Sequence, residues 1–214
     1  MQGDLWLARP RNFDPATVLD RAVKQFWQHG FEATGVETLC NVMNLGAGSL
    51  YSAFGGKREL FLAALDRYMD QVSKDAIQRI TAPASGMEGI RAYFANLVDA
   101  IAEGRRRRGC LLTNSLVELG ERDPAVFEKI ALNLTRLETA FAAALTRASA
   151  AGEIDAEPGA KSAGYLVCVV QGLNVLANTQ PSRQILDQIV ASTLRSLEGE
   201  PGQARRRRAT QPVQ

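Results

Sequence analysis

Side chains that could contact DNA gather in the short stretch from Ala47 to Lys57. Lys57 carries a positive charge that attracts phosphate, and nearby Ser and Tyr hydroxyl groups can hydrogen-bond to phosphates or bases. Small residues at the start of the stretch would let a helix approach base edges closely. The pattern predicts DNA contacts by Ala47, Gly48, Ser49, Tyr51, Ser52 and Lys57.

The elements that must position these side chains are two short helices joined by a tight turn. Residues 36–43 have apolar side chains at helical spacing and are expected to form the first helix. Asn44 suits the turn because Asn tolerates a positive φ. Residues 47–54 are expected to form the second helix, which Gly55 ends before another helix starts at Lys57. This order predicts a helix-turn-helix, a device that lays one helix in the DNA major groove.

The second of these helices contains no Arg, Lys, Asn or Gln. We therefore do not expect bidentate hydrogen bonds to guanine or adenine, and sequence preference would come from Tyr51, the Ser hydroxyls, contacts to thymine methyl groups and DNA shape. Arg9 and Arg11 precede the first helix and are expected to reach into the minor groove. The alternative for both arginines is a solvated N-terminus.

Residues from about Arg11 to Tyr68 resemble the DNA-binding domain of the TetR family of bacterial transcriptional regulators. Residues 109–126, GCLLTNSLVELGERDPAV, are similar to the second domain of one subgroup. The resemblance implies a repressor that a small-molecule effector releases from a palindromic operator, and it adds Thr34 to the DNA contacts. It is carried by Leu19, Ala22, Phe26, Gly30, Phe31, Thr34, Leu39, Leu45, Gly48, Ser49, Leu50, Tyr51, Phe54, Lys57 and Leu60.

The hydropathy pattern predicts an all-α protein of about nine helices, since no strand pattern occurs in the sequence. Residues 1–56 are expected to form the N-terminal arm and a three-helix DNA-binding domain. Residues 57–198 are expected to form a larger helical domain for ligand binding and dimerisation. A long helix over residues 57–80 would be shared by both domains, and residues 199–214 are expected to be a disordered basic tail.

The helix expected over residues 160–178 is apolar nearly all round, so it must be covered on two sides. One side can face its own domain, and the other predicts a partner subunit. The helix expected over residues 182–197 offers apolar side chains to the same surface. The predicted homodimer interface consists of Tyr165, Val169, Gly172, Leu173, Ile185, Ile189 and Leu197.

Polar side chains among apolar ones in the larger domain could orient a ligand in a mostly apolar pocket. The alternative is that these groups bond to one another in the core or at the dimer contact. The expected effector pocket consists of Tyr93, Asn96, Leu97, Cys110, Asn114, Phe127 and Gln171.

The three cysteines, Cys40, Cys110 and Cys168, lack metal-binding spacing. Cys110 follows four arginines at the expected start of a helix, and both features favour the reactive thiolate. Sensing of oxidants or electrophiles by Cys110 is therefore an alternative to ligand sensing. The other possibility is that Cys110 is simply a small buried residue, as most free cysteines are. Cys40 and Cys168 are expected in the core.

The sequence offers little support for an enzyme, a metal site or a cofactor. It lacks a Gly-rich phosphate loop and a nucleophile motif, and its one histidine, His29, is expected at a helix end on the surface. A net charge of +2 excludes a polycation. With no signal peptide or membrane span apparent, we expect a bacterial cytoplasmic protein associated with the nucleoid. An adaptor that kept the fold but lost DNA binding is a further alternative.

Overall fold

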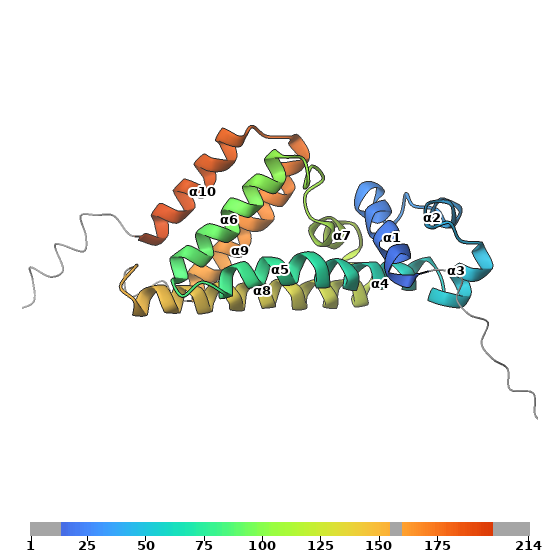
Figure 1. Cartoon of the computed structure of the whole chain (residues 1–214), viewed down its shortest axis with the longest axis horizontal. Helices are drawn as coiled ribbons and strands as arrows, with labels where there is room; N and C mark the ends of the chain where they lie inside the picture. Colours follow the sequence, from blue (N-terminus) through green and yellow to red (C-terminus); the bar gives the residue numbers. More distant parts are fainter. Residues whose placement is uncertain (1–13, 155–159, 199–214) are drawn as a thin grey trace, which may run out of the picture. The chain divides into compact units, whose positions relative to one another are not determined.

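The computed structural model describes residues 14–154 and 160–198, and these residues contain helices and no strand (Figure 1). The prediction of an all-α protein is confirmed. The predicted contacts of Arg9 and Arg11 and the predicted tail from Gly199 lie outside the described residues. The chain divides into two compact units between Arg67 and Tyr68, within the helix that the sequence pattern shares between two domains.

The first unit contains a small bundle of helices that begins with a well-capped element. The Asp14 side chain accepts hydrogen bonds from the backbone N–H groups of Ala16 and Thr17, which satisfies the free donors of the first turn. Hydrogen bonding from Thr17 also lowers the pKa of Asp14. The helices are α1 (Pro15–His29), α2 (Val36–Met43), α3 (Ala47–Phe54) and α4 (Lys57–Tyr68).

Three aromatic side chains join α1 to α4 in the core of this unit. The ring of Phe26 meets that of Phe61 edge to face at 4.9 Å, and Phe31 lies 5.0 Å from Phe61. At the surface, the Arg67 guanidinium donates two hydrogen bonds, of 2.8 and 3.1 Å, to the Asp20 carboxylate. These contacts fix α4 against α1 and leave α2 and α3 to form the outer part of the motif.

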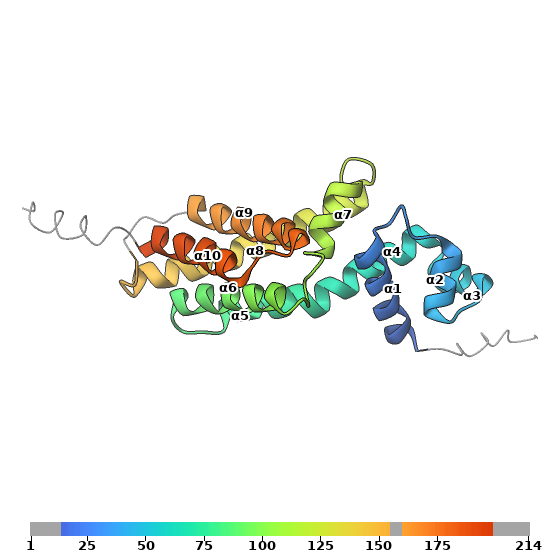
Figure 2. The same cartoon turned by 90° about the horizontal axis from the view of Figure 1, so that it is seen from above.

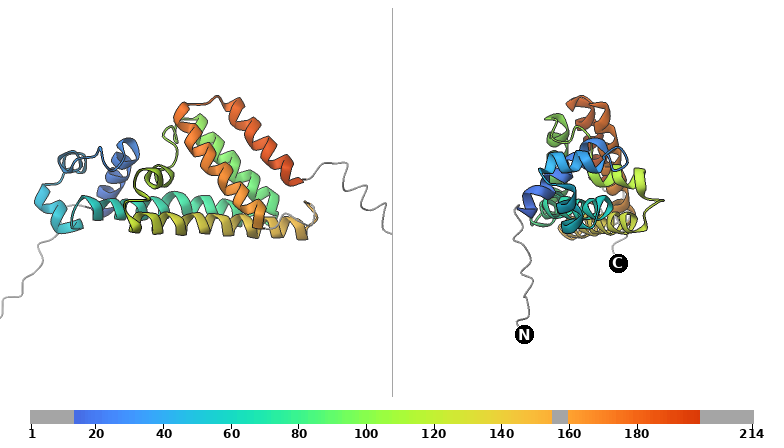
Figure 3. Two further views of the ribbon diagram at one scale, coloured as in Figure 1. Left: turned by 180° about the vertical axis from the view of Figure 1, so that it is seen from behind. Right: turned by 90° about the vertical axis from the view of Figure 1, so that its right-hand side faces the viewer.

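The second unit is a larger layered bundle. Helix α8 packs lengthwise against α5, while α6 and α9 cross this pair and α10 lies against α6 and α9 (Figures 2 and 3). Its elements are a π-helical turn (Met69–Ser73), α5 (Lys74–Thr81), α6 (Gly86–Ala102), α7 (Leu111–Leu119), α8 (Pro124–Ala150), α9 (Ala160–Leu176), a short 3-10 turn (Ala177–Thr179) and α10 (Arg183–Glu198).

The interior of this unit is centred on aromatic contacts between α6 and α8. The Tyr93 ring meets Phe141 edge to face at 5.2 Å, and Phe94 stacks on Phe141 at 6.0 Å. Apolar side chains of α9 and α10 complete the same core, including Leu173 and Leu197, which are 1% and 6% exposed. Burial of these side chains is the main source of stability for the unit.

The structure corrects the expected course of one helix and the expected burial of two cysteines. The predicted helix over residues 57–80 is interrupted, because the Lys74 N–H donates to the Met69 carbonyl and closes a π-helical turn. Cys168 is exposed and Cys40 is half-buried, so neither is a core residue.

None of the described helices combines the length and the hydropathy needed to cross a membrane.

Candidate nucleic-acid interface and ligand cavity

Helix α3 presents one face to solvent and anchors itself with the other. Ala47, Gly48, Ser49, Tyr51 and Ser52 are all exposed, and Tyr51 retains 54% of its surface. Within the described residues, the three hydroxyl groups on this face have no hydrogen-bond partner. The opposite side chain of Leu50 is fully buried and holds the helix in the unit. The structure thus brings together five of the predicted DNA-contact residues on one open surface.

The turn before α3 has the backbone that the sequence predicts. Asn44 adopts the left-handed conformation, with φ 55° and ψ 49°, at the end of α2. The Arg21 guanidinium donates to the carbonyl of Met43 at 3.3 Å and so holds the end of α2 against α1. This contact fixes the orientation of the turn, and the sequence reading missed it because it joins residues far apart in the chain.

Lys57 opens α4 beside the exposed face of α3. Its Nζ atom lies 4.2 Å from the centre of the Phe31 ring, a cation–π contact that restrains the side chain. Within the described part of the chain Lys57 forms no ion pair, so its positive charge is available to a phosphate. A helix N-terminus adds further attraction for an anion.

Thr34 is a correction to the predicted set of DNA contacts. Its side chain is fully buried, and its hydroxyl group donates to the Gly30 carbonyl at 2.6 Å. The hydroxyl therefore closes the connection between α1 and α2, and this structure does not offer it to DNA.

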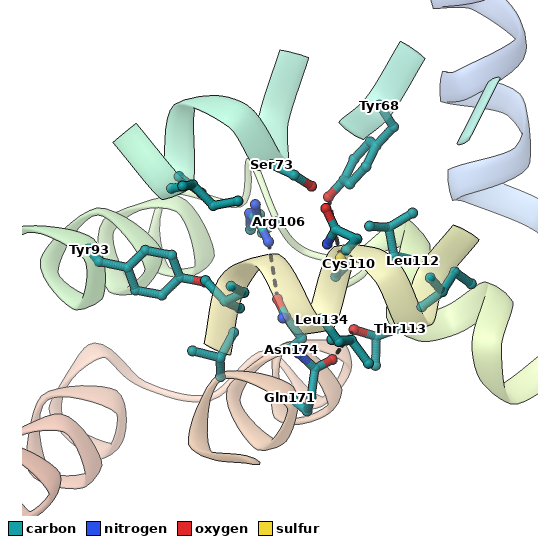
Figure 4. Close-up of a pocket in the computed structure, with 16 residues that line it drawn as sticks. Tyr68, Ser73, Tyr93, Arg106, Cys110, Leu112, Thr113, Leu134, Gln171 and Asn174 are labelled. Carbon is teal, nitrogen blue, oxygen red and sulfur yellow. Dashed lines mark hydrogen bonds between the residues drawn. The ribbon is translucent and has the colours of Figure 1, made fainter. Parts of the chain in front are cut away.

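The second unit contains a cavity of about 40 Å³ lined by side chains of α5, α6, α7, α8 and α9, of the residues from Tyr68 to Ser73 and of the connection between α6 and α7 (Figure 4). Apolar side chains from α5, α8 and α9 form part of its wall. The polar side chains that line it are Tyr68, Ser73, Tyr93, Arg106, Cys110, Thr113, Asn133, Gln171 and Asn174.

Only some of the predicted pocket residues line this cavity. Tyr93, Cys110 and Gln171 do. Leu97 is buried in the core instead, and Phe127 on α8 is 51% exposed. Asn114 donates to the Arg108 carbonyl at 2.8 Å, and Asn96 is half-buried on α6. Neither residue lines the cavity. The residues of the predicted pocket that do not line the cavity are therefore Asn96, Leu97, Asn114 and Phe127.

Arg106 is the charged residue among several cavity residues that the predicted set lacked. Four consecutive arginines follow α6, but the chain turns at Gly104, where φ is 77°, and the Arg106 N–H donates to the Ala100 carbonyl at 2.8 Å. Arg106 then points into the cavity and donates to Oδ1 of Asn174 at 3.2 Å (Figure 4). The run alone gave no signal of which arginine would turn inward.

Burial sets the protonation of the groups around Arg106. Desolvation raises the pKa of Tyr68 and that of Tyr93 well above their ordinary value, so both phenols are neutral at neutral pH. Burial alone would lower the pKa of Arg106, but the interactions with Tyr68, Cys110 and Tyr93 outweigh it and the pKa is raised. Arg106 therefore keeps its positive charge.

The connection between α6 and α7 lies tightly against α9. A Cβ atom added at Gly109, where φ is 68°, would come within 2.1 Å of the Asn174 carbonyl oxygen. Beyond this contact, the Thr113 hydroxyl donates to Oε1 of Gln171 at 2.6 Å. These contacts hold Cys110 and Arg106 at the cavity wall.

The predicted dimer residues divide between surface and core. Tyr165 and Ile185 are 44% and 46% exposed, and Gly172 is also exposed. Val169 and Ile189 are partly buried against the core. Leu173 and Leu197 belong to the core of their own unit, so the prediction that they form an interface is wrong. Val175, 55% exposed on α9, was not in the predicted interface set.

A small helical unit with an open helix-turn-helix surface, joined to a larger helical unit with a cavity, is the arrangement of a helix-turn-helix transcriptional regulator. Two family models match the chain. The one described as "Bacterial regulatory proteins, tetR family" matches residues 18–64, and "Tetracyclin repressor-like, C-terminal domain" matches residues 86–193. The chain belongs to the TetR family.

Named relatives agree with this assignment. The transcriptional repressor ComR of Escherichia coli is 31% identical over 189 residues, which cover 87% of this chain and 90% of ComR. The regulator YezE of Bacillus subtilis is 34% identical over 151 residues, covering 71% and 78% of the two chains. A structure of a CifR cysteine mutant with 26-base-pair operator DNA has a TM-score of 0.79 and 28% identity, and covers 88% of this chain and 99% of CifR.

The described residues contain no group of three or more His, Cys, Asp and Glu side chains arranged to hold a metal ion. The family is one of transcriptional regulators.

Proposed function

We propose that this protein is a repressor that binds an approximately palindromic operator as a twofold homodimer and leaves it when a small effector binds. The observation that carries the proposal is the face of α3, on which the hydroxyl groups of Ser49, Tyr51 and Ser52 are exposed and unpaired while Leu50 anchors the helix. Hydroxyl groups on a helix of this kind can reach phosphates and base edges in the major groove. No catalytic step belongs to this role.

Two relatives support the choice of repression and of an operator. ComR is named a repressor, and a CifR cysteine mutant is seen in complex with operator DNA. A protein with this role would act at the bacterial nucleoid.

The exposed apolar side chains of α9 and α10 support the dimer. Tyr165, Val175 and Ile185 would be covered by the same residues of a second copy. A twofold axis gives two α3 helices, which would read half-sites one helical turn of DNA apart.

The effector would act through the helix that links the two functions along the chain. Helix α4 begins at Lys57, a candidate phosphate contact, and ends at Tyr68, a residue of the cavity wall. A ligand that prefers one arrangement of Tyr68 shifts the population of states and so changes DNA affinity.

A second candidate function is thiol sensing by Cys110, because this residue lies on the cavity wall beside Arg106 and Tyr68. Cys110 is only partly buried, so a small electrophile in the cavity could reach its sulfur. Operator release by N-ethylmaleimide should then be lost in Cys110→Ser and kept in Cys168→Ser. A Cys110→Ser protein with the full response would exclude this sensor.

The main test presents the purified protein with a randomised duplex library and with DNA upstream of its own gene, at two salt concentrations. The expected result is an enriched palindrome whose affinity falls steeply as salt rises, since bound Lys and Arg side chains release counterions from DNA. Weak binding with no sequence preference would contradict the proposal and favour an adaptor that retained the fold alone.

A further inference from the structure

The cavity of the second unit holds a positive charge that no carboxylate balances. Among the described residues that line it, none is Asp or Glu. Arg106 takes part in no ion pair within the described ranges, and its hydrogen bond to Asn174 goes to a neutral amide. Arg106 is half-buried and also hydrogen-bonds to the Cys110 thiol. Taking a guanidinium group partly out of water without an anionic partner is costly, and a bound anion would relieve that cost.

Two further donors at the cavity are unused. Tyr93 and Asn133 are each 8% exposed, and neither side chain has a hydrogen-bond partner among the described residues. The Tyr93 hydroxyl points toward the centre of the cavity, on the side where Arg106 lies (Figure 4). Because these donors line the cavity and have no partner in the protein, they are available to a ligand with acceptor oxygens.

The apolar part of the cavity wall indicates the chemistry of the rest of the ligand. Ile77, Leu137 and Val170 supply apolar surface next to the polar group. A volume of about 40 Å³ corresponds to roughly three water molecules, because each needs roughly 10–15 Å³ of such space. The ligand is therefore small, and it carries an apolar portion that an inorganic anion lacks.

We infer that this cavity is a binding site for a compact organic carboxylate, held by the Arg106 guanidinium and the Tyr93 hydroxyl, with its short hydrocarbon portion against Ile77, Leu137 and Val170. Arg presents paired N–H groups that match the two oxygens of a carboxylate. That this ligand is the effector rests on the proposed function, whereas its binding does not.

The test uses calorimetry on the full-length protein at neutral pH and constant ionic strength. The probes are sodium acetate and sodium propionate, the matched neutral amides acetamide and propionamide, and inorganic phosphate. We expect propionate to bind about tenfold or more tightly than propionamide, a difference of about 1.4 kcal/mol. Equal binding of acid and amide, or no binding of either acid, would overturn the inference; tighter binding of phosphate would overturn the organic character of the ligand.

Variants within the arginine run locate the site. Arg106→Gln should abolish the preference for acid over amide, while Arg107→Gln, an exposed neighbour, should retain it. Arg106→Lys keeps the charge without the paired donors, so it should bind propionate more weakly than the wild type. If Arg106→Gln does not fold, this variant tests whether Arg106 forms the site. Cys110→Ser should still bind the acid. Unchanged affinity in both Arg106 variants would overturn the site.

Operator binding measured in the same samples separates this inference from the proposed function. Propionate that binds and releases the operator supports both. Propionate that binds while the operator stays bound supports the site and contradicts its role as the effector site. An operator-binding protein with no affinity for either acid contradicts the inference alone.

Discussion

The Tyr68 hydroxyl group lies 3.6 Å from the sulfur of Cys110, so the last residue of α4 contacts the residue that precedes α7. Tyr68→Phe removes this weak hydrogen bond and the hydroxyl's hydrogen bond with the Leu111 backbone, and it keeps the ring, which is 1% exposed. We expect the variant to fold and to lose about 1 kcal/mol of unfolding free energy. Urea denaturation measures the loss. Tyr51→Phe, whose hydroxyl is exposed and unpaired, is the matched control and should be unchanged.

Lys57 and Tyr51 should affect DNA binding in different ways. Lys57→Ala should weaken binding about equally for all sequences and reduce the salt slope by about one, because it removes one phosphate contact. Tyr51→Ala should reduce sequence preference as well, since this side chain lies on the exposed face of α3. Fluorescence anisotropy with operator and scrambled duplexes separates these effects. Lys74→Ala, an exposed lysine of α5, is the control.

Gly109 should be among the least replaceable residues of the second unit. In Gly109→Ala, the new Cβ would meet the Asn174 carbonyl oxygen at a backbone φ of 68°. We expect a loss of about 3 kcal/mol in unfolding free energy from overlap and backbone strain together. Gly104→Ala has a similar φ of 77° and no atom within 4 Å, so it should lose only about 1 kcal/mol. Equal losses in chemical denaturation would show that the overlap contributes nothing.

Stability should fall at alkaline pH because of Tyr93. Burial raises its pKa in the folded state, so its contribution is complete below the unfolded value near pH 10 and is lost as pH rises through the folded value. Above about pH 10 the unfolding free energy should drop by about 1.4 kcal/mol per pH unit for each such tyrosine. Denaturation curves of Tyr93→Phe should show a shallower decline than the wild type. An identical pH profile in the two proteins would contradict this role of Tyr93.

The exposed apolar residues of α9 and α10 should control oligomeric state. The double variant Val175→Lys and Ile185→Lys should be monomeric in light scattering, because it places charges in the proposed interface. Cys168, exposed on α9, should also react faster with iodoacetamide in that monomer than in the wild type. Val117→Lys alters a side chain that is 82% exposed on α7 and should leave the dimer intact. A dimeric double variant would rule out this surface.

Local sequence signals predicted the helices well where capping and turn residues were strong. Asp123 caps α8 through the N–H groups of Ala125 and Val126, and Pro124 begins the helix, so its start could be read from the sequence. Asn44 likewise marked the turn between α2 and α3. The interruption after Tyr68 was missed because the apolar spacing continues through the π-helical turn.

Surface and cavity positions depended on contacts between distant residues, which the sequence pattern does not contain. Four adjacent arginines look alike in sequence, and only the fold directs Arg106 inward. Helix α9 looked apolar all round, so the pattern could not decide that Leu173 faces its own core while Cys168 faces outward. The sequence pattern placed Thr34 among the DNA contacts because it does not contain the hydrogen bond from the Thr34 hydroxyl to the Gly30 carbonyl.

The π-helical turn makes the length of the chain between Tyr68 and Ser73 matter as much as its composition. Residues five apart on a regular α-helix differ by about 140° in direction, whereas a π-helical turn brings such residues onto one side. Tyr68, which precedes this turn, and Ser73, its last residue, both line the cavity. A single inserted or deleted residue here would rotate one of them away from the cavity without changing any side chain. The number of residues in this turn therefore determines which side chains can contact a ligand.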